Sequence, residues 1–164
     1  MCINDLPEDH AVVKFANMRK IPKQHWNLLY YTDDFGSFMK KLDPDVLPFG
    51  MEERLIIPFF NKKGDVVAAQ GRSLNMKDEA NARFTAKYIT VKADKSIDRL
   101  WYGLWRTNIT KRVYVVEGPL DSLFLQNSVA MVGAGALKAI PERFDNTPMT
   151  YILDNEPRNR QICS

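Results

Sequence analysis

The sequence predicts an α/β protein made of a mixed α+β N-terminal lobe and a second α/β lobe built on a parallel sheet. Three observations predict this class. The pattern of residues 6–47 is typical of helices, and two β-strands around a tight turn follow it. The last third of the chain then alternates continuous apolar runs with short helix-like runs, as in strand–helix–strand units. With 164 residues, the chain is long enough for two small lobes.

The composition is that of a folded globular protein, because 45% of the residues are hydrophobic and 26% are charged. No apolar run is long enough to cross a bilayer, and the first ten residues lack the pattern of a signal peptide. We therefore expect a cytoplasmic protein that does not contact membranes. Cys2 and Cys163 belong to no CxxC pair, and His10 and His25 do not complete a set of zinc ligands, so we expect no structural zinc.

The charge is distributed unevenly over three expected regions: a helical N-terminal region (1–48), a mixed, basic, β-rich lobe (49–112) and an α/β domain (113–164). Residues 54–112 carry 13 basic and 5 acidic side chains, a net charge of +8, whereas the net charge of residues 1–53 is −3. This concentration of positive charge suits a polyanionic partner. A solvated, lysine-rich surface has the same composition, so charge alone leaves both interpretations open.

In the N-terminal region, prolines and a hydroxyl residue mark the expected helix starts. Pro7 stands where a first-turn proline would stand, and Pro22 opens a second helix-like run that continues to Tyr31. Thr32 is the expected N-cap of a third helix. The aromatic side chains of this region are expected in the core: Trp26, Tyr30, Tyr31, Phe35 and Phe38.

The middle region has the pattern of a sheet. Residues 54–60 and 65–74 flank the turn NKKG, which ends at Gly64, so we expect a β-hairpin. Residues 86–92, with the sequence AKYITVK, predict a further strand. The apolar run 96–107 predicts a short helix or an irregular segment packed on the sheet.

Three continuous apolar strands are expected in the last third, at residues 112–116, 129–133 and 149–153. They lack polar alternation, which is typical of strands covered on both faces. A short helix-like run at 119–127 and a helical or turn-like run at 136–144 separate them. Right-handed crossovers through such helices make consecutive strands parallel, so we expect a parallel sheet here.

Acidic side chains follow these strands where the strands end. Glu117 ends the first strand, Asp121 lies near the start of the next helix, and Asp154 ends the third strand with Glu156 two residues later. The carboxyl ends of parallel strands meet at one edge of a sheet, so these carboxylates are expected to converge. Two carboxylates about 4 Å apart repel by roughly 4 kcal/mol at an effective dielectric of about 20, and a divalent cation would remove that cost. An all-oxygen ligand set favours Mg²⁺, with Mn²⁺ as a substitute; helix-capping or solvated acids are the ordinary alternative.

These motifs resemble a known family. "VYVVEGPLDSLFL" and "YILDNEPRN" resemble the TOPRIM domain shared by topoisomerases, DnaG-type primases and some nucleases. The upstream order of "RLIIPFFNKKGDVVAAQGRSL", "AKYITV" and "LWYGL" is similar to the catalytic RNA-polymerase core of DnaG-type primases, and the acidic motifs are most similar to those of T-even-type bacteriophage primases. The resemblance covers roughly residues 50–164 well and the N-terminal helices more loosely.

The resemblance implies a two-lobed core, with TOPRIM at 113–164, that synthesises short RNA primers by metal-dependent nucleotidyl transfer in phage-type DNA replication. It implies that Glu117, Asp154 and Glu156 are catalytic acids that bind the metal together with Asp121. The implied partners are a single-stranded DNA template, ribonucleoside triphosphates and a replicative helicase, in the host-cell cytoplasm. The positions implied to bind nucleotide or template are Arg72, Lys87, Tyr88 and, as a weaker match, Arg54; Tyr88 is equally well explained as a core aromatic.

Two features depart from the family. Such primases carry an N-terminal zinc ribbon, for which this chain has no cysteine set, and their TOPRIM domain continues beyond the second acidic motif. We therefore expect a fragment, a split-gene product or a partial sequence, truncated within TOPRIM. Two alternatives to a primase stay open. One is another TOPRIM enzyme, nuclease-like or topoisomerase-like, and the other is an incomplete fragment that only binds single-stranded DNA or a helicase.

Overall fold

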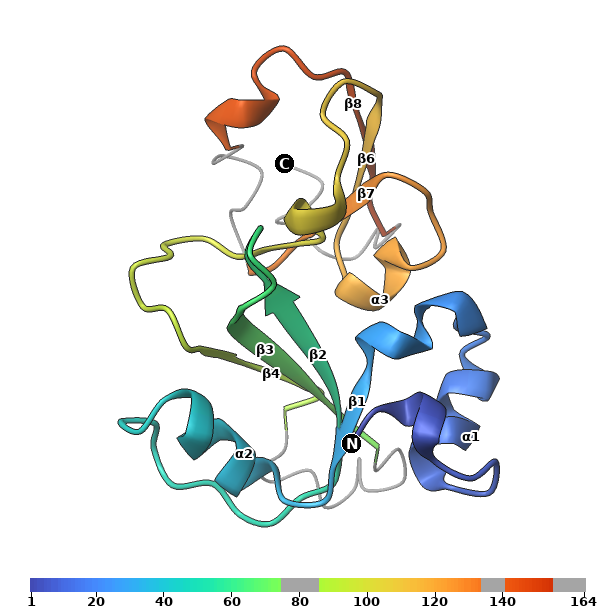
Figure 1. Cartoon of the computed structure of the whole chain (residues 1–164), viewed down its shortest axis with the longest axis vertical. Helices are drawn as coiled ribbons and strands as arrows, with labels where there is room; N and C mark the ends of the chain where they lie inside the picture. Colours follow the sequence, from blue (N-terminus) through green and yellow to red (C-terminus); the bar gives the residue numbers. More distant parts are fainter. Residues whose placement is uncertain (75–85, 134–140, 155–164) are drawn as a thin grey trace. The chain divides into compact units, whose positions relative to one another are not determined.

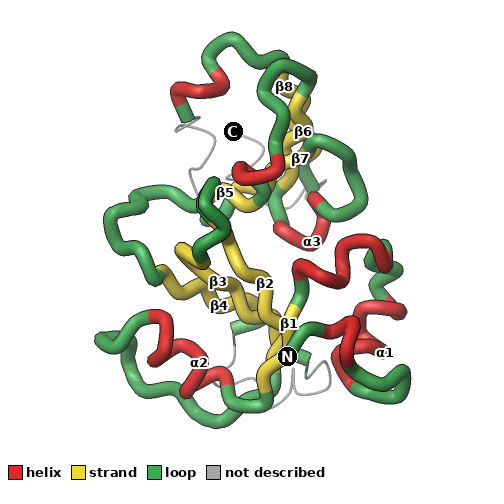
Figure 2. Tube along the Cα trace, in the orientation of Figure 1, coloured by secondary structure: helices red, strands yellow, loops and turns green. Residues whose placement is uncertain are grey.

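The computed structural model describes residues 1–74, 86–133 and 141–154, which divide between two units, Met1–Asp98 and Arg99–Ser164 (Figure 1). Each unit contains its own four-stranded sheet, antiparallel in the first and mostly parallel in the second (Figure 2). The expected α/β class is thereby confirmed. The finer division at residues 48 and 112 stays a prediction about domains.

The first unit is built around a sheet with the strand order β1-β2-β3-β4. Helices from the N-terminal region pack with this sheet. The strands are β1 (Tyr30–Thr32), β2 (Arg54–Phe60), β3 (Val66–Ser73) and β4 (Tyr88–Lys92). The helices described are α1 (Ala11–Met18), α2 (Phe35–Leu42) and the 3₁₀-helices η1 (Ile3–Asp5) and η2 (Lys23–Leu28).

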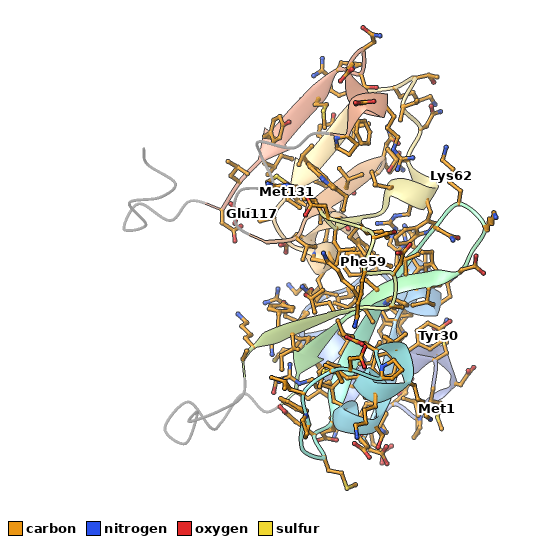
Figure 3. The ribbon with its side chains drawn as sticks, turned by 90° about the vertical axis from the view of Figure 1, so that its left-hand side faces the viewer. Met1, Tyr30, Phe59, Lys62, Glu117 and Met131 are labelled. Carbon is orange, nitrogen blue, oxygen red and sulfur yellow. The ribbon has the colours of Figure 1, made fainter. Side chains whose placement is uncertain are left out.

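The predicted β-hairpin between β2 and β3 is confirmed. The Asn61 side chain closes its turn, because Oδ1 accepts hydrogen bonds from the backbone N–H groups of Lys63 (2.9 Å) and Asp65 (3.0 Å). Gly64 adopts a φ of +89°, a left-handed conformation that side chains disfavour. Lys62 is exposed in this turn (Figure 3).

Helix α2 packs against one face of this sheet because a glycine leaves room for an aromatic ring. A Cβ on Gly71 would stand 2.4 Å from Cε2 of Phe35, so only glycine allows the ring to lie there. Phe35 is fully buried. Its cluster consists of Phe35, Met39, Ile56, Ala69 and Val91.

The expected helix starts in the N-terminal region are wrong in detail. Helix α1 begins at Ala11, and His10 is its N-cap, because His10 Nδ1 accepts a hydrogen bond from Val12 N at 3.2 Å. Pro7 therefore lies outside the first turn of α1. Asp34, not Thr32, caps α2 by accepting a hydrogen bond from the Ser37 backbone at 3.0 Å, as expected from the stronger capping preference of aspartate.

The second expected helix is also shorter than predicted. Pro22 precedes a 3₁₀-helix of six residues, and Tyr30 and Tyr31 enter strand β1 instead. Pairing with β2 uses the strand preference of these aromatic residues. Trp26 is buried as predicted, whereas Tyr30 is 36% exposed, so the core prediction is wrong for Tyr30.

The second unit has a sheet with the strand order β5-β7-β6-β8. The predicted parallel pairing is confirmed, since β6 pairs in parallel with both β7 and β8. The strands are β5 (Trp101–Tyr102), β6 (Val113–Val116), β7 (Ser128–Met131) and β8 (Met149–Ile152). The helices described are α3 (Pro119–Ser122) and the 3₁₀-helices η3 (Leu104–Arg106) and η5 (Glu142–Phe144).

Strand β5 was not anticipated. It lies in the run 96–107, which was expected to be a helix or irregular, and it pairs antiparallel with β7. One core cluster of this unit consists of Trp101, Val113, Val115, Val129, Met131 and Phe144. Part of the predicted helix at 136–144 lies outside the described residues. Within the described ranges, no helix is both long enough and apolar enough to span a bilayer.

Candidate functional site

The candidate site lies at the carboxyl ends of strands β6 and β8. Val116, the last residue of β6, pairs with Ile152, the last residue of β8. The chain segments that leave these two parallel strands therefore start at the same edge of the sheet. Glu117 follows β6 directly, and Asp154 follows β8 by two residues.

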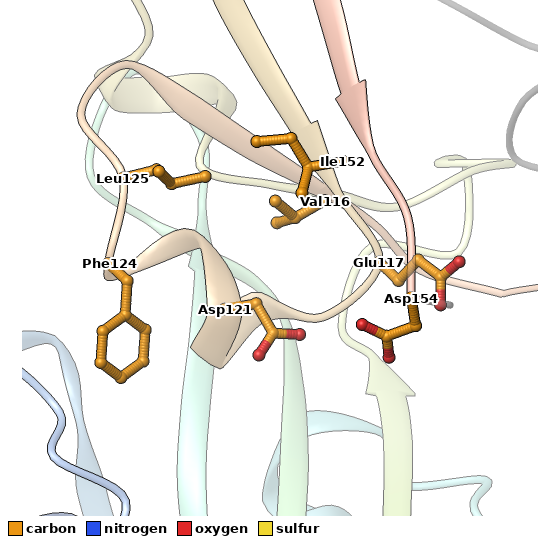
Figure 4. A pocket seen from close by; sticks show the side chains of 7 residues that line it. All are labelled: Val116, Glu117, Asp121, Phe124, Leu125, Ile152 and Asp154. Atoms are coloured by element: carbon orange, nitrogen blue, oxygen red, sulfur yellow. The ribbon is translucent and has the colours of Figure 1, made fainter. Parts of the chain in front are cut away.

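Glu117, Asp121 and Asp154 line a single open pocket of about 280 Å³ in the second unit. Figure 4 shows the carboxylates of Asp121 and Asp154 turned toward each other, with Glu117 beside Asp154. The structure thus brings together three of the four predicted acids. The fourth, Glu156, lies outside the described residues.

Helix α3 positions Asp121 because several hydrogen bonds hold this short helix in place. Ser122 is fully buried, and its Oγ donates to Pro119 O at 2.6 Å. The Ser122 carbonyl accepts a hydrogen bond from Ser128 Oγ on β7 at 2.6 Å. Arg106 Nη2 on η3 donates to Ser122 Oγ at 3.2 Å. Pro119 occupies the first helical position, where its missing N–H costs nothing.

The donor set fits a hard divalent cation. Every polar side chain that lines the pocket is a carboxylate, and oxygen ligands that are partly open to solvent suit Mg²⁺ or Mn²⁺. In the part of the chain that the structure describes, no three acidic, histidine or cysteine side chains lie close enough to form a metal-binding group. The pocket therefore offers carboxylate oxygens at one edge of the sheet, but the acids described there do not by themselves form a metal-binding group. Glu156 lies beyond the described ranges.

The first unit contains a basic and aromatic cluster formed by Arg72, Lys87 and Tyr88. Arg72 and Tyr88 are direct partners on β3 and β4, and the Arg72 guanidinium lies 5.3 Å from the Tyr88 ring centroid. Lys87 Nζ lies 6.0 Å from the same centroid. Arg72 is almost fully buried, donates to the Ser73 carbonyl and also lies over Phe15. Lys87 and Tyr88 are exposed, so this part of the cluster faces solvent.

Arg54 is placed differently from the other basic residues. It is completely buried, and its guanidinium donates to Gly71 O (2.8 Å), Ala86 O (2.9 Å) and the Glu52 carboxylate (3.2 Å). The Phe35 ring covers it at 5.0 Å, and burial lowers the pKa of its guanidinium. The predicted contact of Arg54 with nucleotide or template is not supported by this position. Its contacts instead give it a structural role between β2 and β3.

The sequence interpretation missed the apolar side of the acidic pocket. The pocket is also lined by Val116, Phe124, Leu125 and Ile152. Phe124 is 49% exposed and Ile152 is 45% exposed. The sequence did contain a signal for this apolar side. Asp121 and Phe124 are three residues apart, a spacing that places both side chains on one face of a helical turn.

Comparison with known proteins identifies solved structures that share this fold. The Aquifex aeolicus primase (zinc-binding and RNA polymerase domains) shares the fold with a TM-score of 0.62 and 17% identity, over 94% of this chain and 45% of that chain. The E. coli primase catalytic core matches with a TM-score of 0.63 and 16% identity, over 90% of this chain and 56% of that chain. The RNA polymerase domain of Mycobacterium tuberculosis primase DnaG matches with a TM-score of 0.61 and 16% identity, over 93% of this chain and 61% of that chain. No protein-family profile matches the chain. The chain therefore shares the fold of these primase catalytic cores.

The sequence comparison matches the chain to a phage protein. The chain is 35% identical to the DNA primase of Enterobacteria phage T4 over 159 residues, which is 96% of this chain. It is therefore a relative of a phage DNA primase, as the acidic motifs predicted. The aligned region is 43% of the length of the T4 protein, so the chain spans less than half of that relative.

Proposed function

We propose that this chain is the catalytic core of a DNA primase, which synthesises short RNA primers on single-stranded DNA by metal-dependent nucleotidyl transfer. One observation carries the proposal. Three carboxylates line one pocket at the ends of parallel strands, in a chain 35% identical to a phage DNA primase. The substrates would be ribonucleoside triphosphates and a single-stranded template, in the host-cell cytoplasm.

Glu117, Asp121, Asp154 and Glu156 are the proposed metal ligands, with Glu117, Asp154 and Glu156 as the catalytic acids. In primer synthesis, a 3′-hydroxyl attacks an α-phosphate and pyrophosphate leaves. Mg²⁺, or Mn²⁺ in its place, would supply a Lewis acid that activates the hydroxyl and offsets charge on the phosphoryl oxygens. The chain's own contribution is to hold the carboxylates at one edge of the sheet, which the strand pairing of β6 and β8 supports.

The basic cluster is the proposed contact for the nucleic acid. Lys87 would pair with phosphate oxygens, and the exposed Tyr88 ring would stack on a base. Arg72 would hold the Tyr88 ring in place, since its guanidinium lies over that ring. Solved relatives include a DnaG catalytic domain bound to single-stranded DNA, which supports this substrate class. A replicative helicase is a further proposed partner, for which no contact surface is assigned.

The proposal is tested by Glu117→Gln in the full-length parent protein. Primer synthesis is measured with labelled ribonucleoside triphosphates on a single-stranded template, and template binding is measured in parallel. The variant should lose synthesis and keep template binding, because it removes one negative charge from the acidic pocket and none from the basic cluster. Glu142→Gln is the matched control, since Glu142 is exposed on η5 and does not line the pocket.

Each alternative gives a different result in these assays. Wild-type synthesis by Glu117→Gln would contradict the assigned role. Magnesium-dependent nicking without primer synthesis would favour a nuclease-like TOPRIM enzyme. Template binding without any metal-dependent reaction would favour a chain that only binds DNA or a helicase.

A further inference from the structure

We propose that Phe124 is a base-stacking residue of the acidic pocket. Its ring would receive the nucleobase of the nucleotide whose phosphate lies at the carboxylates. This inference rests on the proposed function and names a further substrate contact in the same site.

Phe124 and Asp121 are joined by a single turn. The Phe124 backbone N–H donates to the Asp121 carbonyl at 3.1 Å. Side chains three residues apart on a helical turn are neighbours, with Cβ atoms about 5–6 Å apart. Both side chains line the same pocket (Figure 4). A ligand held at Asp121 therefore places an attached ring within reach of Phe124.

The pocket has two chemically different sides. Carboxylates form one side, and the side chains of Val116, Phe124, Leu125 and Ile152 form the other. Phe124 and Ile152 are each about half exposed, so the apolar side is open to solvent. A ligand that matches both sides must bring a cation to the acids and a flat apolar surface to the ring. A nucleotide with its divalent cation has both features.

An apolar protein segment is a poorer match for the same pocket. It would cover Glu117, Asp121 and Asp154 without bringing a cation to them, and removing a carboxylate from water is costly. Base stacking on an aromatic side chain tolerates any base, because every base has a π-face. The ring at Phe124 therefore suits an enzyme that must accept all four nucleotides.

The test compares three substitutions in the full chain: Phe124→Ala, Phe124→Leu and Phe124→Trp. Two binding arms are measured with Mg²⁺ present, one with a ribonucleoside triphosphate and one with a short single-stranded DNA. The alanine and leucine variants should bind in one arm roughly 5- to 30-fold more weakly, because they lack a π-face, and the tryptophan variant should retain affinity. The arm that changes identifies the source of the base. A matching rise in the KM of primer synthesis is expected when the nucleotide arm changes.

Ile109→Ala is the matched control, because Ile109 is 40% exposed in the same unit and does not line the pocket. Unchanged binding by Phe124→Ala in both arms would overturn the proposal. Full affinity of Phe124→Leu would also overturn it, since an apolar cover would then suffice. Failure of the proposed function is recognised separately. If Glu117→Gln is inactive but Phe124→Ala has a wild-type KM and wild-type affinities, only the stacking role fails.

Discussion

The Oδ2 atom of Asp121 lies 2.6 Å from the position that a Cβ on Gly118 would occupy. The Asp121 carboxylate thus fills the space that any other residue at 118 would need. Backbone freedom is not the reason for this glycine, since its φ of −115° and ψ of 141° are open to all residues. The spacing of glycine and aspartate in the acidic motif therefore has a steric explanation.

Gly118→Ala should lower primer synthesis by about 10- to 100-fold, because the Asp121 carboxylate must move away from the new methyl group. The free energy of unfolding should fall by less than about 1 kcal/mol, since a side chain and not the backbone gives way. Activity assays and urea unfolding measure the two effects. Gly50→Ala is the control, because nothing lies within 4 Å of a Cβ at Gly50. Undiminished synthesis by Gly118→Ala would show that the position of Asp121 is unimportant.

Arg54→Met should destabilise the first unit by about 3–5 kcal/mol, because it leaves the Glu52 carboxylate without its buried cation. The carbonyls of Gly71 and Ala86 lose their donors as well. Urea unfolding followed by circular dichroism measures the loss. Lys95→Met, which removes ion pairs of a side chain that is 58% exposed, should leave stability unchanged. A stable Arg54→Met variant with weakened nucleotide binding would restore the ligand role for Arg54.

Lys87→Ala should weaken binding of single-stranded DNA and reduce the salt dependence of log K by about 0.7, the value for one phosphate contact on a single strand. Fluorescence anisotropy of a labelled oligonucleotide at several salt concentrations measures both quantities. Lys63→Ala is the control, since Lys63 is an equally exposed lysine in the turn between β2 and β3. Identical salt slopes for the two variants would place the DNA elsewhere.

Stability should fall as the pH rises from about 10 to about 12, because two tyrosines are harder to deprotonate in the folded protein. Burial and the hydrogen bond to Glu53 raise the pKa of Tyr31 to about 12, and burial raises the pKa of Tyr102 to about 12. In this pH window the unfolded chain has lost protons that the folded chain keeps, so rising pH favours unfolding. Tyr31→Phe should remove part of the slope in urea unfolding. An unchanged slope would show that Tyr31 titrates normally.

The sequence was sufficient where one local signal decided the structure. Continuous apolar runs predicted the parallel strands β6, β7 and β8, and the acids after them predicted a shared pocket. The sequence was insufficient where pairing between strands decides the structure of a segment against its local residue pattern. Tyr30 and Tyr31 join a strand because β2 offers a partner, and β5 has only two residues.

The burial of two basic residues likewise could not be predicted from the sequence. Arg54 and Arg72 both belong to the positively charged middle region, and the family resemblance implied that both contact nucleotide or template. The structure buries both side chains against aromatic rings, which no charge count could anticipate. Phe124 was missed for the opposite reason, because an apolar residue in a helical run is expected in the core and is here half exposed.

Strand β6 is hydrogen-bonded on both sides, whereas β8, among the strands described, is bonded to β6 alone. Glu117 therefore extends from a doubly anchored support and Asp154 from a singly anchored one. We therefore expect the backbone at Asp154 to be more compliant than the backbone at Glu117. Such a difference would let the pocket change its width while its place at the sheet edge stays fixed.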